Sequence, residues 1–179
     1  MIPVFLANGF EEIEALATVD LLRRAGVEVV TVGVGSKMPV GAHNIAVCAD
    51  IGEDELDLNS IDGVVLPGGM PGTTNLEASA VVQSAVAFAA ERGMLLAAIC
   101  AAPSILGHGG YLCGKNATCY PGFEAELSDA IVVKGGVVTD GNIITASGAG
   151  VAVDFALELV RYLVSSEESA AIRGGIQCP

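Results

Sequence analysis

The chain has 179 residues, of which 52% are hydrophobic, 16% are charged and only 4% are aromatic. This apolar content can fill the core of one ordinary domain and excludes intrinsic disorder, so we expect a single domain over residues 1–179. The 21 acidic residues outnumber the 8 basic ones and give a net charge of −13, which argues against a nucleic-acid or anionic-membrane partner because cations recognise both.

Short apolar runs alternate with helical segments along the chain. The expected strands cover residues 4–7, 27–32, 63–67 and 94–99, with three short β pieces within 130–146. The expected helices cover residues 11–25, 79–93, 101–108 and 150–164, and a polar tail with one short helix begins at residue 165. Strands joined by helices pair in parallel. The sequence therefore predicts a doubly wound α/β fold, with a mostly parallel sheet sandwiched by helices.

Two features of the chain predict a cytoplasmic protein. No apolar run approaches the roughly 20 residues of a membrane helix, and the acidic Glu11 and Glu12 follow the start too soon for a signal peptide. The odd number of cysteines predicts free thiols in a reducing compartment. They are Cys48, Cys100, Cys113, Cys119 and Cys178.

Unusual residues follow three of the expected strands. They occupy residues 8–14, 66–72 and 98–103. Because the carboxyl ends of parallel strands meet at one edge of a sheet, where ligands bind, we expect these three turns to form one site.

Cys100 is the strongest candidate for chemistry. It lies where an apolar strand turns directly into a helix and is followed by Ala101 and a second alanine. This pattern is typical of a nucleophile elbow, and a helix N-terminus lowers the pKa of a thiol. The backbone N–H groups of Ala101 and Gly69 are candidates for an oxyanion hole. The simpler alternative, a buried structural cysteine, is about equally common.

Glu14 and the glycine pair Gly68–Gly69 are further candidates. Glu14 lies one turn inside the first helix, beside its apolar face; if drawn inward it would have a raised pKa and act as a hydrogen-bond donor. A solvated helix acid is the more common alternative. The two glycines allow the backbone to approach a ligand closely, although a plain tight turn explains them equally well.

No cofactor or metal is expected. The chain lacks the glycine-rich and Lys-Ser/Thr patterns of phosphate-binding loops. His108 is expected to point away from the elbow, because it lies near the end of the helix that Cys100 opens. Its spacing to Cys113 and Cys119 matches no common zinc pattern.

Several of these motifs occur together in a known family. Residues 8–14, 66–69 and 98–103, with 19–26, 47–50, 145–150 and 154–157, resemble the ThiJ/PfpI superfamily. Within it, they are similar to the DJ-one-like branch of the parkinsonism-associated protein deglycase, from the first strand to about Leu163. The resemblance implies a flavodoxin-like fold, a homodimer, a reactive Cys100 and a protonated Glu14 hydrogen-bonded to it, with Gly69 and Ala101 as backbone donors.

The resemblance also defines the functional alternatives. Family members are described as glyoxalases, protein or nucleotide deglycases, redox-regulated chaperones, or peptidases, and their cysteine oxidises readily to sulfinate. Members with strong glyoxalase-type or hydrolytic chemistry usually have a histidine near the cysteine, and here Tyr120 occupies that position. A phenol with a pKa of ~10 is a poor general base at neutral pH.

We therefore expect a cofactor-independent glyoxalase or deglycase that uses Cys100 and Glu14 on small reactive carbonyls. The alternative is a redox-sensing stress protein or chaperone whose Cys100 reacts with an oxidant to give sulfinate. A peptidase or amidase is least favoured, because the histidine is missing. The apolar content and the resemblance both favour a homodimer. The resemblance also implies that the first helix and residues 43–48 form the interface.

Overall fold

The computed structural model describes residues 1–179, which form a central β-sheet with helices on both faces. The strands are β1 (Ile2–Ala7), β2 (Val29–Val34), β3 (Ile51–Gly52), β4 (Gly63–Leu66), β5 (Leu95–Ile99), β6 (Asn116–Ala117), β7 (Ile131–Val132), β8 (Val137–Asp140) and β9 (Ile143–Ala146). The helices are α1 (Glu12–Arg24), α2 (Gly72–Ala78), α3 (Ala80–Glu91), α4 (Pro103–His108), α5 (Ala152–Leu163) and α6 (Ser166–Gly175).

Seven strands form the main sheet, in the order β3-β2-β1-β4-β5-β9-β8. All neighbouring pairs are parallel except the hairpin of β8 and β9 at one edge. The short strands β6 and β7 form a separate parallel pair. The flavodoxin-like, mostly parallel fold predicted from the sequence is therefore confirmed.

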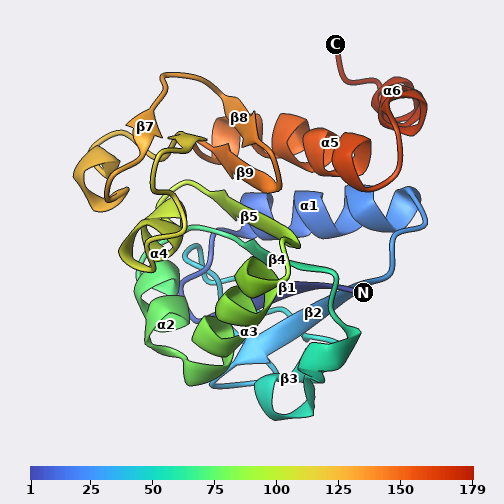
Figure 1. Ribbon diagram of the computed structural model, residues 1–179. Coiled ribbons are helices and arrows are strands. Elements are labelled where there is room, and N and C mark those ends of the chain that lie inside the picture. The colour runs from blue at the N-terminus through green and yellow to red at the C-terminus, as the bar shows by residue number, and fades with distance from the viewer.

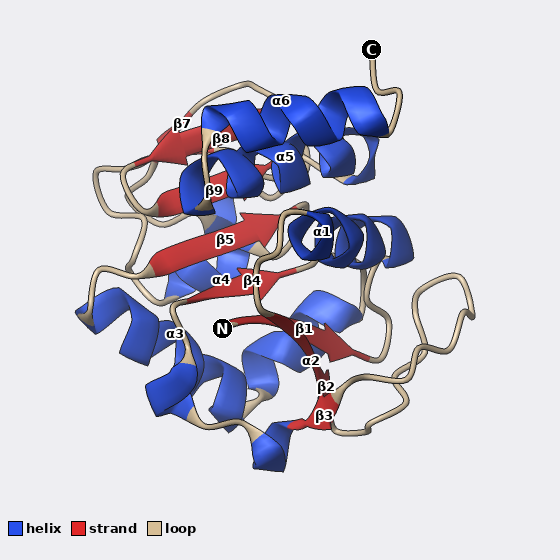
Figure 2. Ribbon diagram, turned by 90° about the vertical axis from the view of Figure 1, so that its right-hand side faces the viewer, coloured by secondary structure: helices blue, strands red, loops and turns tan.

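Helices cover the two faces of the sheet and enclose two apolar cores. One face carries α1 and α5, with α6 packed beside α5, and the other carries α2, α3 and α4 (Figures 1 and 2). The strands β1, β4 and β5 are buried throughout, and their alternating side chains enter both cores. Strands with apolar residues on both faces are typical of parallel sheets covered on both sides.

The helix α2 was not predicted from the sequence. Its first residues, Gly72, Thr73 and Thr74, have low helix propensity, so the local pattern indicates a turn. Contacts with neighbouring turns compensate: the hydroxyl of Thr73 donates to the Gly69 carbonyl, and the Asn75 amide donates to the Asn8 carbonyl. Tertiary contacts thus form a helix that propensity alone does not favour.

None of the six helices has the length and apolar character needed to cross a membrane. The polar tail forms α6, as expected, and Ser169 near its middle donates a hydrogen bond to the Leu157 carbonyl of α5.

Candidate active site

The three turns singled out in the sequence meet at one edge of the sheet. They follow β1, β4 and β5, which are neighbours in the sheet, with β4 in the centre. The turns are joined by backbone hydrogen bonds, because the Glu11 N–H donates to the Gly68 carbonyl at 2.9 Å. The structure therefore brings the three turns together, and their role as one functional site stays a prediction.

Cys100 lies on a sharp turn between β5 and α4. Its φ is +66°, in the left-handed region that non-glycine residues rarely occupy and that is strained when they do. The turn is fixed on both sides: the Cys100 N–H donates to the Ala146 carbonyl at 2.8 Å, and its carbonyl accepts from the Tyr120 N–H at 2.7 Å. A strained cysteine at a strand-to-helix turn has the geometry of a nucleophile elbow.

Glu14 points from the first turns of α1 into the protein interior. Its side chain is only 1% exposed, and its Oε2 accepts the Gly68 N–H at 2.8 Å. The second oxygen, Oε1, is buried and has no hydrogen-bond partner. The Cys100 thiol is the neighbouring polar side chain that interacts with this carboxyl. Burial raises the pKa of Glu14 to about 7. Glu14 is therefore a buried acid of the site and not a solvated helix residue.

The pKa of Cys100 differs from the sequence-based expectation. Burial, followed by the charge of ionised Glu14, raises it to about 12, although the N–H groups of Gly69 and Ala101 donate hydrogen bonds that lower it. The expected net lowering by the helix N-terminus is therefore wrong. When Glu14 holds the proton, its repulsion disappears and its O–H can donate to the sulfur. The protonated form of Glu14 therefore favours the thiolate, and the ionised form opposes it.

The two glycines of the second turn are needed for this contact. A Cβ on Gly68 would lie 2.6 Å from the Cys100 Cβ and 2.8 Å from Glu14 Oε2. Gly69 has a φ of +88°, and a Cβ there would lie 2.4 Å from the Glu11 nitrogen. Any larger residue at either position would separate the turns that hold Cys100 and Glu14 together.

Comparison with known proteins identifies the family. The sequence matches the model of the DJ-1/PfpI family over residues 1–162. The chain belongs to the DJ-1/PfpI family.

Relatives and solved structures agree with this assignment over almost the whole chain. The chain is 35% identical to Protein dj-1beta of Drosophila melanogaster over 176 residues, which cover 97% of this chain and 94% of that protein. It is 28% identical to the glutathione-independent glyoxalase DJR-1.2 of Caenorhabditis elegans over 165 residues, 90% and 87% of the two chains. The structure of oxidized Toxoplasma gondii DJ-1 matches with a TM-score of 0.94 at 33% identity and covers 98% and 97% of the two chains. The resemblance read from the motifs is confirmed.

Tyr120 lies beside Cys100 in this DJ-1/PfpI protein. Its side chain is 50% exposed, and its ring lies 3.4 Å from where a Cβ on Gly148 would be, while the Cys100 sulfur lies 4.0 Å from the same point. Gly148 is a site residue that the sequence analysis missed. Its φ of +154° and its place after β9 are the signals that mark it, and neither can be read from a single glycine in the sequence.

Replacement of Tyr120 by Phe is expected to change turnover of a carbonyl substrate less than about twofold, because a phenol is a poor general base at neutral pH. Tyr120→His is expected to raise kcat/KM about tenfold, since it introduces a base with a pKa near 6.5 at the same place. Steady-state kinetics on both variants tests this. A large loss in Tyr120→Phe would show that the phenol takes part in catalysis.

Neither histidine lies at the Cys100 elbow. His108, at the end of α4, is held by Glu77 and Glu126, so it points away from Cys100 as expected. His43 contacts Glu12, which accepts its backbone N–H at 2.8 Å and meets its ring at 2.9 Å. With Glu11 these residues bring three potential metal ligands together, a cluster the sequence analysis missed. The Glu12 oxygens are already engaged by His43, so we assign no metal there.

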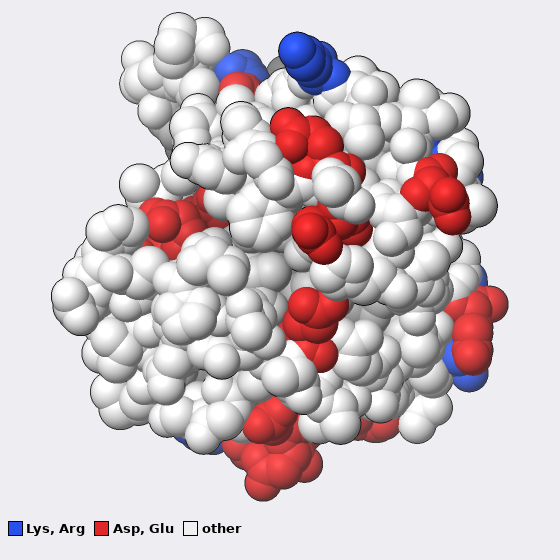
Figure 3. All heavy atoms as spheres, turned by 90° about the vertical axis from the view of Figure 1, so that its left-hand side faces the viewer, with Lys and Arg blue, Asp and Glu red and all other residues white.

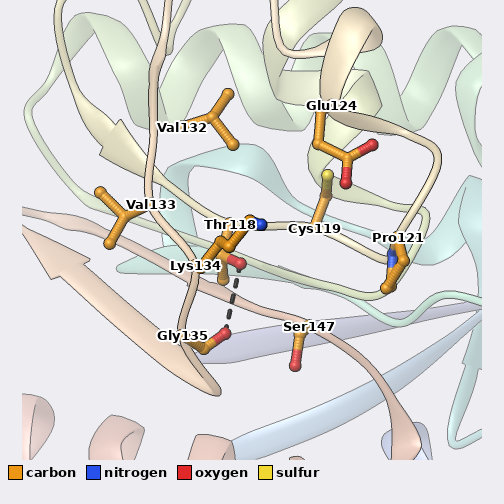
Figure 4. Close-up of a pocket in the computed structure, with 9 residues that line it drawn as sticks. All are labelled: Thr118, Cys119, Pro121, Glu124, Val132, Val133, Lys134, Gly135 and Ser147. Carbon is orange, nitrogen blue, oxygen red and sulfur yellow. Dashed lines mark hydrogen bonds between the residues drawn. The ribbon is translucent and has the colours of Figure 1, made fainter.

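Figure 4 shows a cavity of about 420 Å³ lined by residues of the segments 118–124, 132–135 and 147. Its walls are Thr118, Cys119, Pro121, Glu124, Val132, Val133, Lys134, Gly135 and Ser147. Cys100 is not among them. Tyr120 and Gly148, which lie beside Cys100, are chain neighbours of the lining residues Cys119, Pro121 and Ser147.

Proposed function

We propose that this protein is a cofactor-independent glyoxalase or deglycase that acts on small reactive carbonyls through Cys100. The observation that carries the proposal is the buried Glu14 carboxyl, with a pKa raised to about 7, in contact with the strained Cys100 thiol. A pKa near the working pH allows a carboxyl to donate and accept protons in turn. The glutathione-independent glyoxalase of C. elegans, at 28% identity, supports the same activity class.

The first steps for methylglyoxal use both members of the pair. The Cys100 proton moves to Glu14, and the thiolate attacks the aldehyde carbon to form a carbon–sulfur bond. The carbonyl oxygen receives the proton from Glu14, which gives a hemithioacetal. The N–H groups of Gly69 and Ala101, which donate to Cys100, are well placed to stabilise the developing oxyanion.

Glu14 then acts as the proton shuttle. The carboxylate removes the C–H proton of the hemithioacetal, which gives an enediolate. The hydroxyl proton of this enediolate passes to the neighbouring oxygen, and Glu14 returns the C–H proton to the neighbouring carbon. The result is a thioester of lactate on Cys100. Water hydrolyses the thioester to lactate and regenerates the thiol, so the net reaction is addition of one water to methylglyoxal and needs no cofactor.

The charge of the surface favours a neutral substrate. On the face of the molecule that carries α2 and β7, acidic side chains clearly outnumber basic ones (Figure 3). With a net charge of −13, the protein repels anionic substrates at long range but not neutral dicarbonyls.

Lactate formation from methylglyoxal tests the proposal. We expect steady turnover by the wild type and by Cys48→Ser, which removes an exposed thiol outside the site, and loss of turnover in Cys100→Ser. All three proteins are purified by the same protocol to exclude contaminating enzymes. Wild-type turnover no higher than that of Cys100→Ser would overturn the proposal.

A redox-sensing stress protein is the second candidate. It is supported by partial exposure of Cys100 and by the oxidized state of the related T. gondii DJ-1. Two equivalents of hydrogen peroxide would convert the thiol to sulfinate and release two waters, and the Glu14 O–H would stabilise the product. Peroxide titration with peptide mass mapping distinguishes this candidate: Cys100 should gain two oxygen atoms and stop there. A peptidase or amidase remains the least favoured, since no histidine accompanies Cys100.

We also propose that the protein is a homodimer. Exposed apolar side chains gather on α1 and on the loop between β2 and β3: Ile13 (58% exposed), Leu16 (37%), Met38 (57%) and Ile45 (51%). The loop is joined to the start of α1, because the Ala42 N–H donates to the Phe10 carbonyl.

Light scattering at micromolar concentration should give the mass of two chains, and Ile13→Arg should reduce it to one. Ile131→Arg, an exposed apolar site elsewhere, is the control. The mass of a single wild-type chain would contradict the dimer.

The five free cysteines support a reducing compartment such as the cytoplasm as the place of action.

A further inference from the structure

His108 joins three segments of the chain through its imidazole ring. Its Nδ1 lies 2.5 Å from Glu77 Oε1 at the end of α2, and its Nε2 lies 2.8 Å from Glu126 Oε2. Glu126 closes the short 3-10 helix Glu124–Glu126, and His108 is the last residue of α4. One ring therefore contacts carboxyl groups from two other elements.

This arrangement requires a protonated ring. A carboxylate accepts hydrogen bonds but cannot donate them, whereas a neutral imidazole has one N–H and one lone pair. Only the imidazolium can donate to Glu77 and Glu126 at the same time. These two carboxylates are the charged groups that face the ring, and the hydrogen bonds to Glu77 and then Glu126 raise the pKa of His108 above its usual value.

Each joined segment begins at the reactive centre. α2 follows the Gly68–Gly69 turn that holds Glu14 and Cys100, and α4 follows Cys100 itself. The third segment, residues 119–127, carries Tyr120, whose N–H donates to the Cys100 carbonyl. The three segments enclose a small cavity of about 230 Å³, whose walls include Met70, Ser104 and His108. The His108 cluster thus ties these segments together beyond the site.

We propose that His108 is a protonation-dependent positioning residue, whose imidazolium holds residues 119–127 against α2 and α4 and so fixes the wall of the reactive centre. Loss of the proton replaces one donated hydrogen bond by repulsion between a lone pair and a carboxylate. The segment then separates more often from α4, and Tyr120 and the Cys100 carbonyl are less firmly held. For its effect on turnover, this inference rests on the proposed function.

The reactivity of Cys119 can be used to measure how often residues 119–127 separate from α4. Its thiol lies in the joined segment, is 6% exposed, and has a pKa raised to about 11 by burial and then by the charge of Glu124. Because Cys119 is only 6% exposed, opening of the segment increases its rate of reaction with a thiol reagent, and the labelling rate follows the opening equilibrium. The rate is followed by peptide mass mapping with N-ethylmaleimide, and the exposed Cys113 serves as an internal reference.

The experiment compares His108→Gln with the wild type at pH 6 and pH 9. Because the same thiol is compared at each pH, its own titration cancels. At pH 6 we expect Cys119 to react about threefold to tenfold faster in His108→Gln, as two partly exposed ion pairs are lost. At pH 9 the factor should approach one, since His108 has lost its proton in the wild type as well. His43→Gln, which removes the other histidine, should give a factor near one at both pH values.

The decisive quantity is the Cys119 labelling rate of His108→Gln divided by that of the wild type. A ratio that is the same at pH 6 and pH 9, or that equals one at pH 6, would overturn the inference. If His108→Gln does not fold, Glu126→Gln replaces it, because it removes one carboxylate and leaves the ring in place. Methylglyoxal turnover gives an independent reading: kcat of His108→Gln should lie below wild type at pH 6 and equal it at pH 9. If the ratio does not change with pH while the wild type turns over methylglyoxal, only the role of His108 is refuted. If labelling changes with pH as predicted but the wild type has no turnover, only the proposed glyoxalase activity is refuted.

Discussion

Glu14→Gln is expected to lower methylglyoxal turnover by about 10²–10⁴-fold, to near background. Gln keeps the shape of the side chain and one N–H donor for the sulfur, but it cannot take the C–H proton from the hemithioacetal. Glu14→Leu removes the donor as well, so it should lose turnover and also react more slowly with alkylating reagents at low pH. Lactate formation and Cys100 alkylation, measured on both variants, separate proton transfer from stabilisation of the thiolate. Rates equal to wild type in both variants would exclude Glu14 from the chemistry.

Glu14→Gln is also expected to stabilise the fold at alkaline pH. The pKa of Glu14 is raised from 4.5 to about 7 in the folded protein, so the native state binds more protons than the unfolded state between these values. The stability present below pH 4.5 is therefore lost as the pH rises through about 7. At pH 8 this loss is about 3 kcal/mol, because one pKa unit corresponds to ~1.36 kcal/mol. Glu14→Gln avoids the loss, since Gln carries no charge.

Urea unfolding at pH 4 and pH 8, at one fixed protein concentration, measures the effect. The free energy of unfolding of Glu14→Gln should exceed that of the wild type by about 3 kcal/mol at pH 8 and by almost nothing at pH 4. Glu91→Gln, a substitution of an exposed carboxylate on α3, is the control and should change little at either pH. A wild type as stable as Glu14→Gln at pH 8 would show that Glu14 carries no buried charge.

The sequence contains most of the information that places the site. Apolar runs predict β1, β4 and β5, and the rule that ligands bind at the carboxyl ends of parallel strands brings their turns together. Cys100 can be recognised because it interrupts an apolar strand just before small residues. These features are local in the chain, so a single sequence is sufficient to find them.

Features that depend on distant contacts could not be predicted from local patterns. These patterns left the burial of Glu14 open, and only the family resemblance implied it, because it involves a hydrogen bond with Gly68, 54 residues further along the chain. The pKa of Cys100 shows the same limit: its place before a helix suggests a lowered value, but burial beside Glu14 has the larger, opposite effect. The bonds of His108 to Glu77 and Glu126 likewise join residues 31 and 18 positions apart.

The pH dependence of Cys100 alkylation tests the central claim, that Cys100 and Glu14 share one proton and form the reactive centre. Limited iodoacetamide labelling between pH 5 and pH 10 is followed for all five cysteines by peptide mass mapping. We predict that the Cys100 labelling rate rises with a midpoint near pH 7, where the pair loses its first proton. This midpoint should disappear in Glu14→Gln. A Cys100 profile without this midpoint, or the same profile in Glu14→Gln, would contradict the account.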